Sequence, residues 1–185
     1  AFARFLAQES DEVPSIVPVN EISFWSWAGG QVGYLNPFVR GCGPDLKAQL
    51  SRAGIAAVEA VWEITPEARI VWVDPVIHVA SDSWRPDDRP AASRYTRSQF
   101  EGWDIIAGRQ WPEVGGAEKY LDIVGVNYYF HNQWFYHNGK RIERGQPHYR
   151  PFRDILQEVY ERYQRPLFVS ETGTEAADRP GWLRY

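Results

Sequence analysis

Two hydrophobic patterns alternate along the chain: short apolar runs, and longer segments in which apolar residues recur at helical spacing. The short runs predict strands over residues 15–21, 69–79, 120–130 and 167–170. The helical spacing predicts helices over residues 1–9, about 44–63, about 96–108 and 152–163, with a further helix beginning at 182–185. This regular alternation predicts an α/β fold in which helices pack against a parallel sheet.

Single residues mark where the predicted helices begin. Pro44 and Pro151 lie near the starts of two helices, where a missing backbone N–H is tolerated. Thr96 and Gln99 predict a capping box at the start of the helix over 96–108. The segment 81–92 is rich in Pro, Asp and Arg, and we expect it to be a surface loop.

The connections between the predicted elements are unequal in length. Those that enter strands are short (63–68 and 161–165), whereas those that leave strands are long (22–43, 80–95 and 131–150). In a (β/α) barrel the loops after the strands build the active face. We therefore expect one domain over residues 1–185, with its functional residues at the strand exits.

Composition excludes several classes of function. The net charge is -4 and no basic stripe is visible, so nucleic-acid binding is not expected. The apolar runs are too short to span a membrane. Cys42 is the single cysteine, which favours a reducing cytoplasm over an oxidising compartment. Methionine is absent and the chain begins inside a predicted helix, so we expect a piece of a longer protein.

The sequence holds no pattern typical of a metal or cofactor site. No His, Cys and Asp cluster has metal-ligand spacing, and no glycine-rich phosphate loop is present, so neither a metal nor a nucleotide is expected. Its serines lack a nucleophile-elbow context. Aromatic residues reach 15%, with nine tryptophans, which suits either a sugar-binding cleft or an aromatic core.

Two glutamates are the strongest candidates for chemistry. Glu21 and Glu171 each follow an apolar run, and a carboxylate at the exit of a buried strand is costly unless it has a task. Glu21 lies close to Trp25 and Trp27, whose rings would desolvate it and favour the protonated form. Glu175 is the rival to Glu171, which we prefer because it lies directly at the strand exit. The pair predicts a general acid and a nucleophile.

A third candidate element is the strand end Asn127-Tyr128-Tyr129. Because side chains alternate along a strand, Asn127 and Tyr129 share one face and Tyr128 points toward the helices. A tyrosine hydroxyl on the inner face would donate to the nucleophile. An aromatic strand end without a ligand is the alternative.

The three motifs Asn-Glu, Gly-x-Asn-Tyr-Tyr and Glu-x-Gly, in this order, resemble the retaining glycoside hydrolases of family 1, the β-glucosidase family. The resemblance runs from Val13 to Glu175. It implies strands four to seven of a (β/α)8 barrel, with Glu21 as acid/base and Glu171 as nucleophile. It further implies Asn20 as a contact to the 2-hydroxyl of the sugar and Tyr129 as the partner of the nucleophile.

The sequence departs from the family at two positions. Ile22 stands where the family usually has Pro, and Thr172 where it usually has Asn. Two other classes therefore stay open: a carbohydrate-binding relative without turnover, and a structural fragment of a barrel. Because four parallel strands leave two edges, we expect self-association.

Further candidates for substrate binding lie beside these motifs. His78 and Asp74 are expected on one face of the second strand, where they would contact substrate or form a structural pair. Trp134 opens the loop after the third strand and would offer a stacking platform, and Trp25 lies beside Glu21. With Asn127, they complete the expected carbohydrate-binding set.

Overall fold

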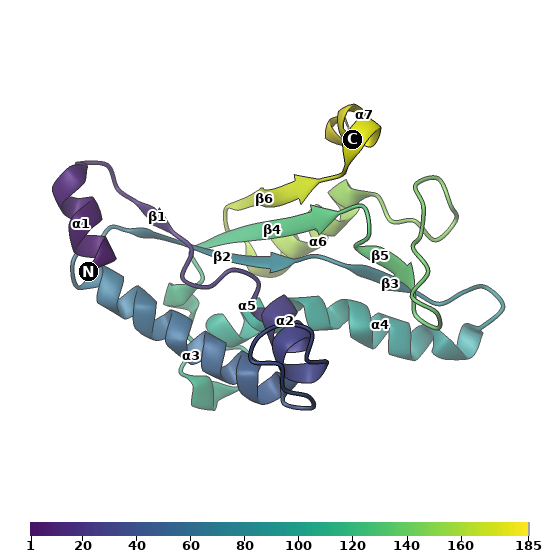
Figure 1. Cartoon of the computed structure of the whole chain (residues 1–185), viewed down its shortest axis with the longest axis horizontal. Helices are drawn as coiled ribbons and strands as arrows, with labels where there is room; N and C mark the ends of the chain where they lie inside the picture. Colours follow the sequence, from purple (N-terminus) through teal and green to yellow (C-terminus); the bar gives the residue numbers. More distant parts are fainter. Residues whose placement is uncertain (185) are drawn as a thin grey trace. The chain divides into compact units, whose positions relative to one another are not determined.

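The computed structural model describes residues 1–184. The chain divides into two compact units, one of Ala1–Asp74 with Glu101–Gly125 and the other of Pro75–Phe100 with Val126–Tyr185. A four-stranded sheet has the order β1 (Ser15–Ile16), β2 (Arg69–Pro75), β4 (Ile123–Tyr129) and β6 (Leu167–Gly173) (Figure 1). β3 (His78–Ala80) pairs in parallel with β5 (Gln133–Phe135). The expectation of one domain stays a prediction.

The first unit combines several helices with β1 and most of β2. It contains α1 (Phe2–Glu9), α2 (Ile22–Trp25), a π-helical turn over Ser26–Gln31, α3 (Gly43–Trp62) and α5 (Glu101–Ile106). Trp72 of β2 is buried, its indole donates to the carbonyl of Tyr120 at 2.8 Å, and its ring lies against Gly54 of α3. Trp103 of α5 donates in turn to the carbonyl of Trp72 at 3.0 Å. Trp72 and Trp103 thus lie in the core of this unit, together with aliphatic residues such as Val58 and Ile70.

The strand expected over 15–21 is shorter in the structure. β1 pairs with β2 only through Ser15 and Ile16, and contact resumes at an isolated bridge between Asn20 and Val73. Pro18 lies between these two points, and it has no N–H to give to the ladder. The chain nevertheless stays beside β2 up to Glu21, whose N–H donates to the carbonyl of Val73 at 2.9 Å.

The second unit contains β3, β5 and β6 with three helices. These are α4 (Arg89–Arg97), α6 (Phe152–Tyr163) and α7 (Arg179–Leu183). The amphipathic pattern of α6 is realised as expected, with Ile155, Val159 and Tyr163 buried. Tyr128 of β4 stacks on Phe152 at 4.1 Å between ring centroids, so its predicted direction toward the helices is confirmed.

The strand expected over 69–79 divides in two. β2 ends at Pro75, and His78 begins β3, so Asp74 and His78 do not share one strand face. The backbone between them turns to other partners, because Val76 donates to the carbonyl of Asn127 and His78 to that of Asn132. The helices over 1–9, 44–63 and 152–163 are confirmed within one residue at either end.

The predicted capping box at Thr96 and Gln99 is wrong. α4 begins at Arg89, inside the segment expected to be loop, and Thr96 lies within this helix. Its hydroxyl accepts from the N–H of Val79 at 2.8 Å and donates to the carbonyl of the same residue at 3.1 Å. Gln99 lies in a 3-10 turn over Ser98–Phe100 and accepts from the N–H of Ile77 at 2.8 Å. Both side chains therefore bind backbone that is remote in sequence.

Candidate active site

Glu171 and Tyr129 form the core of the candidate site in the second unit. Glu171 lies within β6 rather than after it, because this strand continues to Gly173. Tyr129 ends the neighbouring strand β4, and its hydroxyl donates to Oε2 of Glu171 at 2.8 Å. Both side chains are half-buried. The expected contact between the tyrosine and the carboxylate is therefore present.

Asn127 lies two residues before Tyr129 and is fully buried. Its Oδ1 accepts a hydrogen bond from the hydroxyl of Ser170 at 2.7 Å. Ser170 directly precedes Glu171, so the two residues Asn127 and Tyr129 contact consecutive residues of β6. These contacts hold the strand that carries Glu171 at two adjacent points.

His131 belongs to the same cluster, and sequence reasoning gave it no role. Its ring stacks on that of Tyr129, with centroids 5.7 Å apart and planes within 1° of parallel. Burial, together with the charge of Arg141, lowers the pKa of His131. Its place two residues after Tyr129 is the only signal that the sequence offers for this contact.

Glu21 lies in the first unit, directly before α2. Its backbone is left-handed, with φ 55° and ψ 58°, a conformation that costs a residue with a Cβ about 1–2 kcal/mol. Asn20 is exposed and Glu21 is half-buried. Trp25 and Trp27 are 38% and 39% exposed, so neither ring is packed away in a core. The pairing of Glu21 with Glu171 stays a prediction.

A buried polar cluster in the first unit was not foreseen as such. Asp74 is 1% exposed, and its carboxylate accepts from the N–H of Ser23 at 3.0 Å and from its hydroxyl at 2.6 Å. Burial raises the pKa of Asp74 to about 7, and the charge of Glu21 raises it too, whereas the Ser23 bonds and the charge of Lys47 lower it. Lys47 itself is paired with Glu101.

Gly102 makes room for the Asp74 carboxylate. A Cβ at this position would lie 2.4 Å from Oδ2 of Asp74 and 3.1 Å from the hydroxyl of Ser23. The first residues of α5 are therefore packed directly on the buried acid. The Asp74 carboxylate accepts hydrogen bonds from Ser23, which lies two positions after Glu21 in the sequence. Asp74 therefore supports the turn that carries Glu21.

Two other expected binding residues, Trp134 and His78, also lie in the second unit. Trp134 of β5 is half-buried and meets the ring of Tyr95 edge-on, with centroids 5.9 Å apart. His78 lines a cavity whose wall includes neither Tyr129 nor Glu171. No cluster of three or more acidic, His or Cys side chains in residues 1–184 is placed to hold a metal ion. Among the helices described, none is both long and apolar enough to cross a bilayer.

No protein-family model and no curated protein matches the sequence. Solved structures do match its fold. A family 1 β-glucosidase from Thermotoga maritima, bound to isofagomine lactam, is 20% identical with a TM-score of 0.63, over 94% of this chain and 47% of its own. A β-glycosidase from Pyrococcus horikoshii is 19% identical with a TM-score of 0.60, over 89% of this chain and 44% of its own.

The AHE enzyme from Alicyclobacillus herbarius gives a TM-score of 0.70 at 17% identity, over 95% of this chain and 48% of its own. The chain thus spans less than half the length of these three proteins. The fold class predicted from the sequence is confirmed: the structure is that of part of a (β/α)8 barrel, similar to about half of each of these glycosidases.

Proposed function

We propose that this chain carries the catalytic residues of a retaining β-glycosidase, an enzyme that cleaves O-glycosidic bonds. The observation that carries the proposal is the hydrogen bond from Tyr129 to Glu171. The likeness of the fold to a β-glucosidase and a β-glycosidase supports it. The substrate class is a carbohydrate with a β-linked leaving group, and the chemistry needs no metal or cofactor.

Glu171 is assigned as the nucleophile. A nucleophilic carboxylate must stay ionised and hold one orientation toward the anomeric carbon. A hydrogen bond to the charged form serves both needs, since it favours ionisation and restricts rotation of the carboxylate. Tyr129 supplies this bond, and the Ser170–Asn127 contact fixes the backbone beside it.

Glu21 is assigned as the general acid and then the general base. Strained backbone is found preferentially at functional sites, and Glu21 is held in such a conformation. The buried carboxyl of Asp74 lies near enough to interact with its charge. In a retaining enzyme the two catalytic carboxyl groups lie about 5–5.5 Å apart, and this separation is expected for Glu21 and Glu171.

Sugar contacts are proposed beside each of the two glutamates. Asn20 is proposed to bind the 2-hydroxyl of the sugar, and Asn127 to act beside the nucleophile. Trp25 and Trp134 are proposed as stacking surfaces, because both leave part of the ring accessible. His78 is proposed to contact the carbohydrate substrate at a greater distance from the two glutamates.

The decisive experiment compares three single variants on a panel of nitrophenyl β-glycosides. Glu21→Gln and Glu171→Gln are each expected to lower kcat/KM by about 10²–10⁴-fold. Glu175→Gln is the matched control, since Glu175 is an exposed carboxylate four residues after Glu171, and its rate should be unchanged. NMR of the first product should show the same anomer as the substrate.

Two results would decide against the proposal. Equal rates for all three variants would exclude catalysis by these glutamates. A product with inverted anomeric configuration would exclude the role of Glu171 as a nucleophile. Sugar binding without turnover in the unaltered chain would instead support the carbohydrate-binding class that Ile22 and Thr172 leave open.

Self-association is a further part of the proposal. β6 is the last strand in the sheet order, and its apolar residues Phe168 and Val169 are 46% and 36% exposed. Exposed apolar side chains on a terminal strand favour pairing with another chain. The partner proposed is a second copy of this chain.

A further inference from the structure

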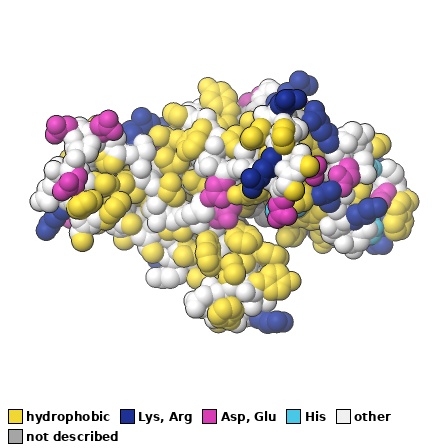
Figure 2. Space-filling view, turned by 45° about the horizontal axis from the view of Figure 1, so that its top comes forward, with side chains coloured by type: hydrophobic (Ala, Val, Ile, Leu, Met, Phe, Trp, Pro, Cys, Tyr) yellow, Lys and Arg dark blue, Asp and Glu magenta, His cyan; other side chains and the backbone are white. Residues whose placement is uncertain are grey.

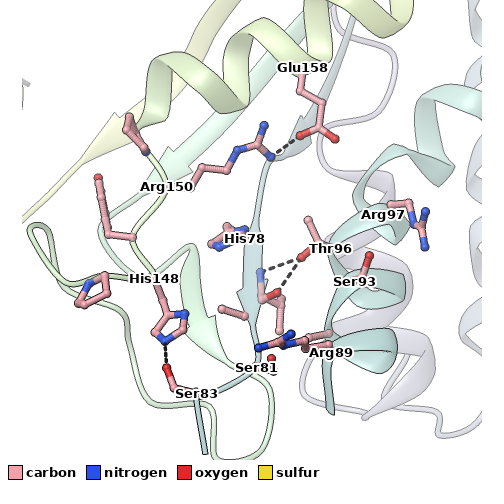
Figure 3. A pocket seen from close by; sticks show the side chains of 16 residues that line it. His78, Ser81, Ser83, Arg89, Ser93, Thr96, Arg97, His148, Arg150 and Glu158 are labelled. Atoms are coloured by element: carbon pink, nitrogen blue, oxygen red, sulfur yellow. Dashed lines mark hydrogen bonds and ion pairs between the residues drawn. The ribbon is translucent and has the colours of Figure 1, made fainter. Parts of the chain in front are cut away.

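A cavity in the second unit lies apart from the candidate catalytic residues. It has a volume of about 780 Å³, within the range of cavities that hold small molecules. β3 and α4 supply one part of its lining, and residues 147–151 with α6 supply the other (Figure 3). Asn127, Tyr129, Trp134 and Glu171 are not among the lining residues.

Positive charge dominates this lining. Arg89, Arg97 and Arg150 contribute to it, against the single acidic residue Glu158. Figure 3 shows Arg89 reaching from α4 toward Ser81, whereas Arg97 points away from the other labelled side chains. Arg89 has no ion pair within residues 1–184. Its guanidinium is therefore available to an anion.

Arg150 is held in place from three directions. Its backbone N–H donates to Oε1 of Gln133 at 2.9 Å, and its carbonyl accepts from Nε2 of the same side chain at 2.7 Å. Its guanidinium pairs with Glu158 and donates to the carbonyl of Asp154 at 3.1 Å. Gln133 is 1% exposed, so this clamp is part of the core. Such preorganisation lowers the entropic cost of binding.

Neutral donors and acceptors complete the wall. Ser81, Ser83 and Ser93 bring hydroxyl groups, and Ser83 is bonded to His148 at 2.9 Å. His78 lies between Arg150 and Thr96 in Figure 3, and its buried Nδ1 has no hydrogen-bond partner in the described part of the chain. Burial, followed by the charge of Arg150, lowers the pKa of His78 and so favours the neutral ring.

We infer that this cavity binds a sugar phosphate. Arginine matches the geometry of phosphate oxygens through its planar fork of donors, which assigns the phosphate to Arg89 near Ser81. The serine hydroxyls and the His78 ring bind the hydroxyl groups of the sugar. A cation is disfavoured by Arg89, and a wholly apolar ligand by the hydroxyl, imidazole and guanidinium groups of the lining. The site is separate from the proposed glycosidase chemistry.

The test is isothermal titration calorimetry of the chain with glucose 6-phosphate, and with glucose as the neutral counterpart. Glucose 6-phosphate should bind with a Kd of about 1 mM or below, and more tightly than glucose. Arg89→Gln should weaken this binding about tenfold or more, because a charge-assisted bond is lost. Arg94→Gln removes the same charge from the same helix outside the lining, and should change the Kd less than about twofold.

Two further variants separate this site from the others. Glu158→Gln removes the only acidic group of the lining and should tighten binding of glucose 6-phosphate. Glu171→Gln should leave it unchanged, even if the proposed glycosidase activity is lost or was never present. Equal effects of Arg89→Gln and Arg94→Gln, equal affinity for glucose and glucose 6-phosphate, or no binding at all would each overturn the inference.

Discussion

At the scale of single residues, Tyr129 is placed to control the carboxylate that we assign as nucleophile. Its hydroxyl is bonded to Glu171, and its ring is backed by His131. Both contacts favour the orientation in which the hydroxyl donates to Glu171. The contact therefore acts as a fixed donor.

Removing this donor should slow the proposed reaction without unfolding the chain. Tyr129→Phe is expected to lower kcat by about ten- to a hundredfold, since hydrogen bonds to charged groups contribute about 1.5–3 kcal/mol. Tyr160→Phe, on the exposed face of α6, serves as the control and should leave kcat unchanged. Steady-state kinetics on a nitrophenyl glycoside measures both. Equal kcat for the two variants would show that the tyrosine contact is only structural.

Asp74 makes the stability of the chain depend on pH. Its folded-state pKa is raised from 3.8 to about 7, so the folded state holds this proton where the unfolded state has lost it. Stability from this group is thus greatest below pH 3.8 and falls as pH rises toward about 7, by up to about 1.4 kcal/mol per pH unit. Asp74→Asn should flatten the profile between these pH values.

Urea denaturation at several pH values measures this dependence. Asp45→Asn, at an exposed position of α3, is the matched control for the loss of a carboxylate. An unaltered slope in Asp74→Asn would mean that the buried carboxyl titrates as in the unfolded chain.

At the scale of elements, close packing between α3 and β2 rests on a glycine. A Cβ at Gly54 would lie 2.6 Å from the edge of the Trp72 ring, which is itself fixed by a hydrogen bond to Tyr120. In an exposed helix, replacing Gly by Ala stabilises by about 1 kcal/mol. Whether Gly54→Ala stabilises or destabilises the chain therefore shows how tightly α3 packs against Trp72.

Gly54→Ala is expected to destabilise the chain by about 1–3 kcal/mol, the usual cost of overpacking. Thermal or urea unfolding measures the change in free energy. Ala56→Gly, on the exposed side of the same helix, gives the helix-propensity term alone. A stabilised Gly54→Ala variant would show that Trp72 moves freely.

Sequence patterns predicted those elements whose cause is local. The spacing of Ile155, Val159 and Tyr163 fixes α6, and strand alternation was enough to place Tyr129 and Tyr128 on opposite faces. The start of α4 was missed although Pro90, in its first turn, is a local signal for it. The division at Pro75 was missed because it depends on backbone bonds to residues distant in sequence. The pairing of Asp74 with Ser23, 51 positions away, has the same origin.

At the scale of the whole molecule, hydrophobic side chains reach the surface in many places. Figure 2 shows them (yellow) over much of the face that is drawn. Among the large ones, Phe2 and Phe5 of α1 are 66% and 56% exposed, and Phe168 of β6 is 46% exposed. Burying such surface against another copy is favourable.

We expect sedimentation velocity to show dimers or larger species whose fraction grows with concentration. Phe168→Asp should shift the distribution toward monomer, because a charge would be buried at the pairing strand. Trp84→Asp is the control, since Trp84 is 67% exposed on a loop outside the sheet. A monomer at all concentrations in the unaltered chain would contradict self-association.

The hydroxyl of Thr96 has a consequence for how the β3–β5 ribbon is bounded. By exchanging two hydrogen bonds with Val79, it takes the place that a neighbouring backbone would fill along β3. A side chain cannot extend the ladder, so growth of this ribbon by strand addition stops at α4. The backbone N–H and C=O of Val79 are thus satisfied within the chain and are not offered to another strand.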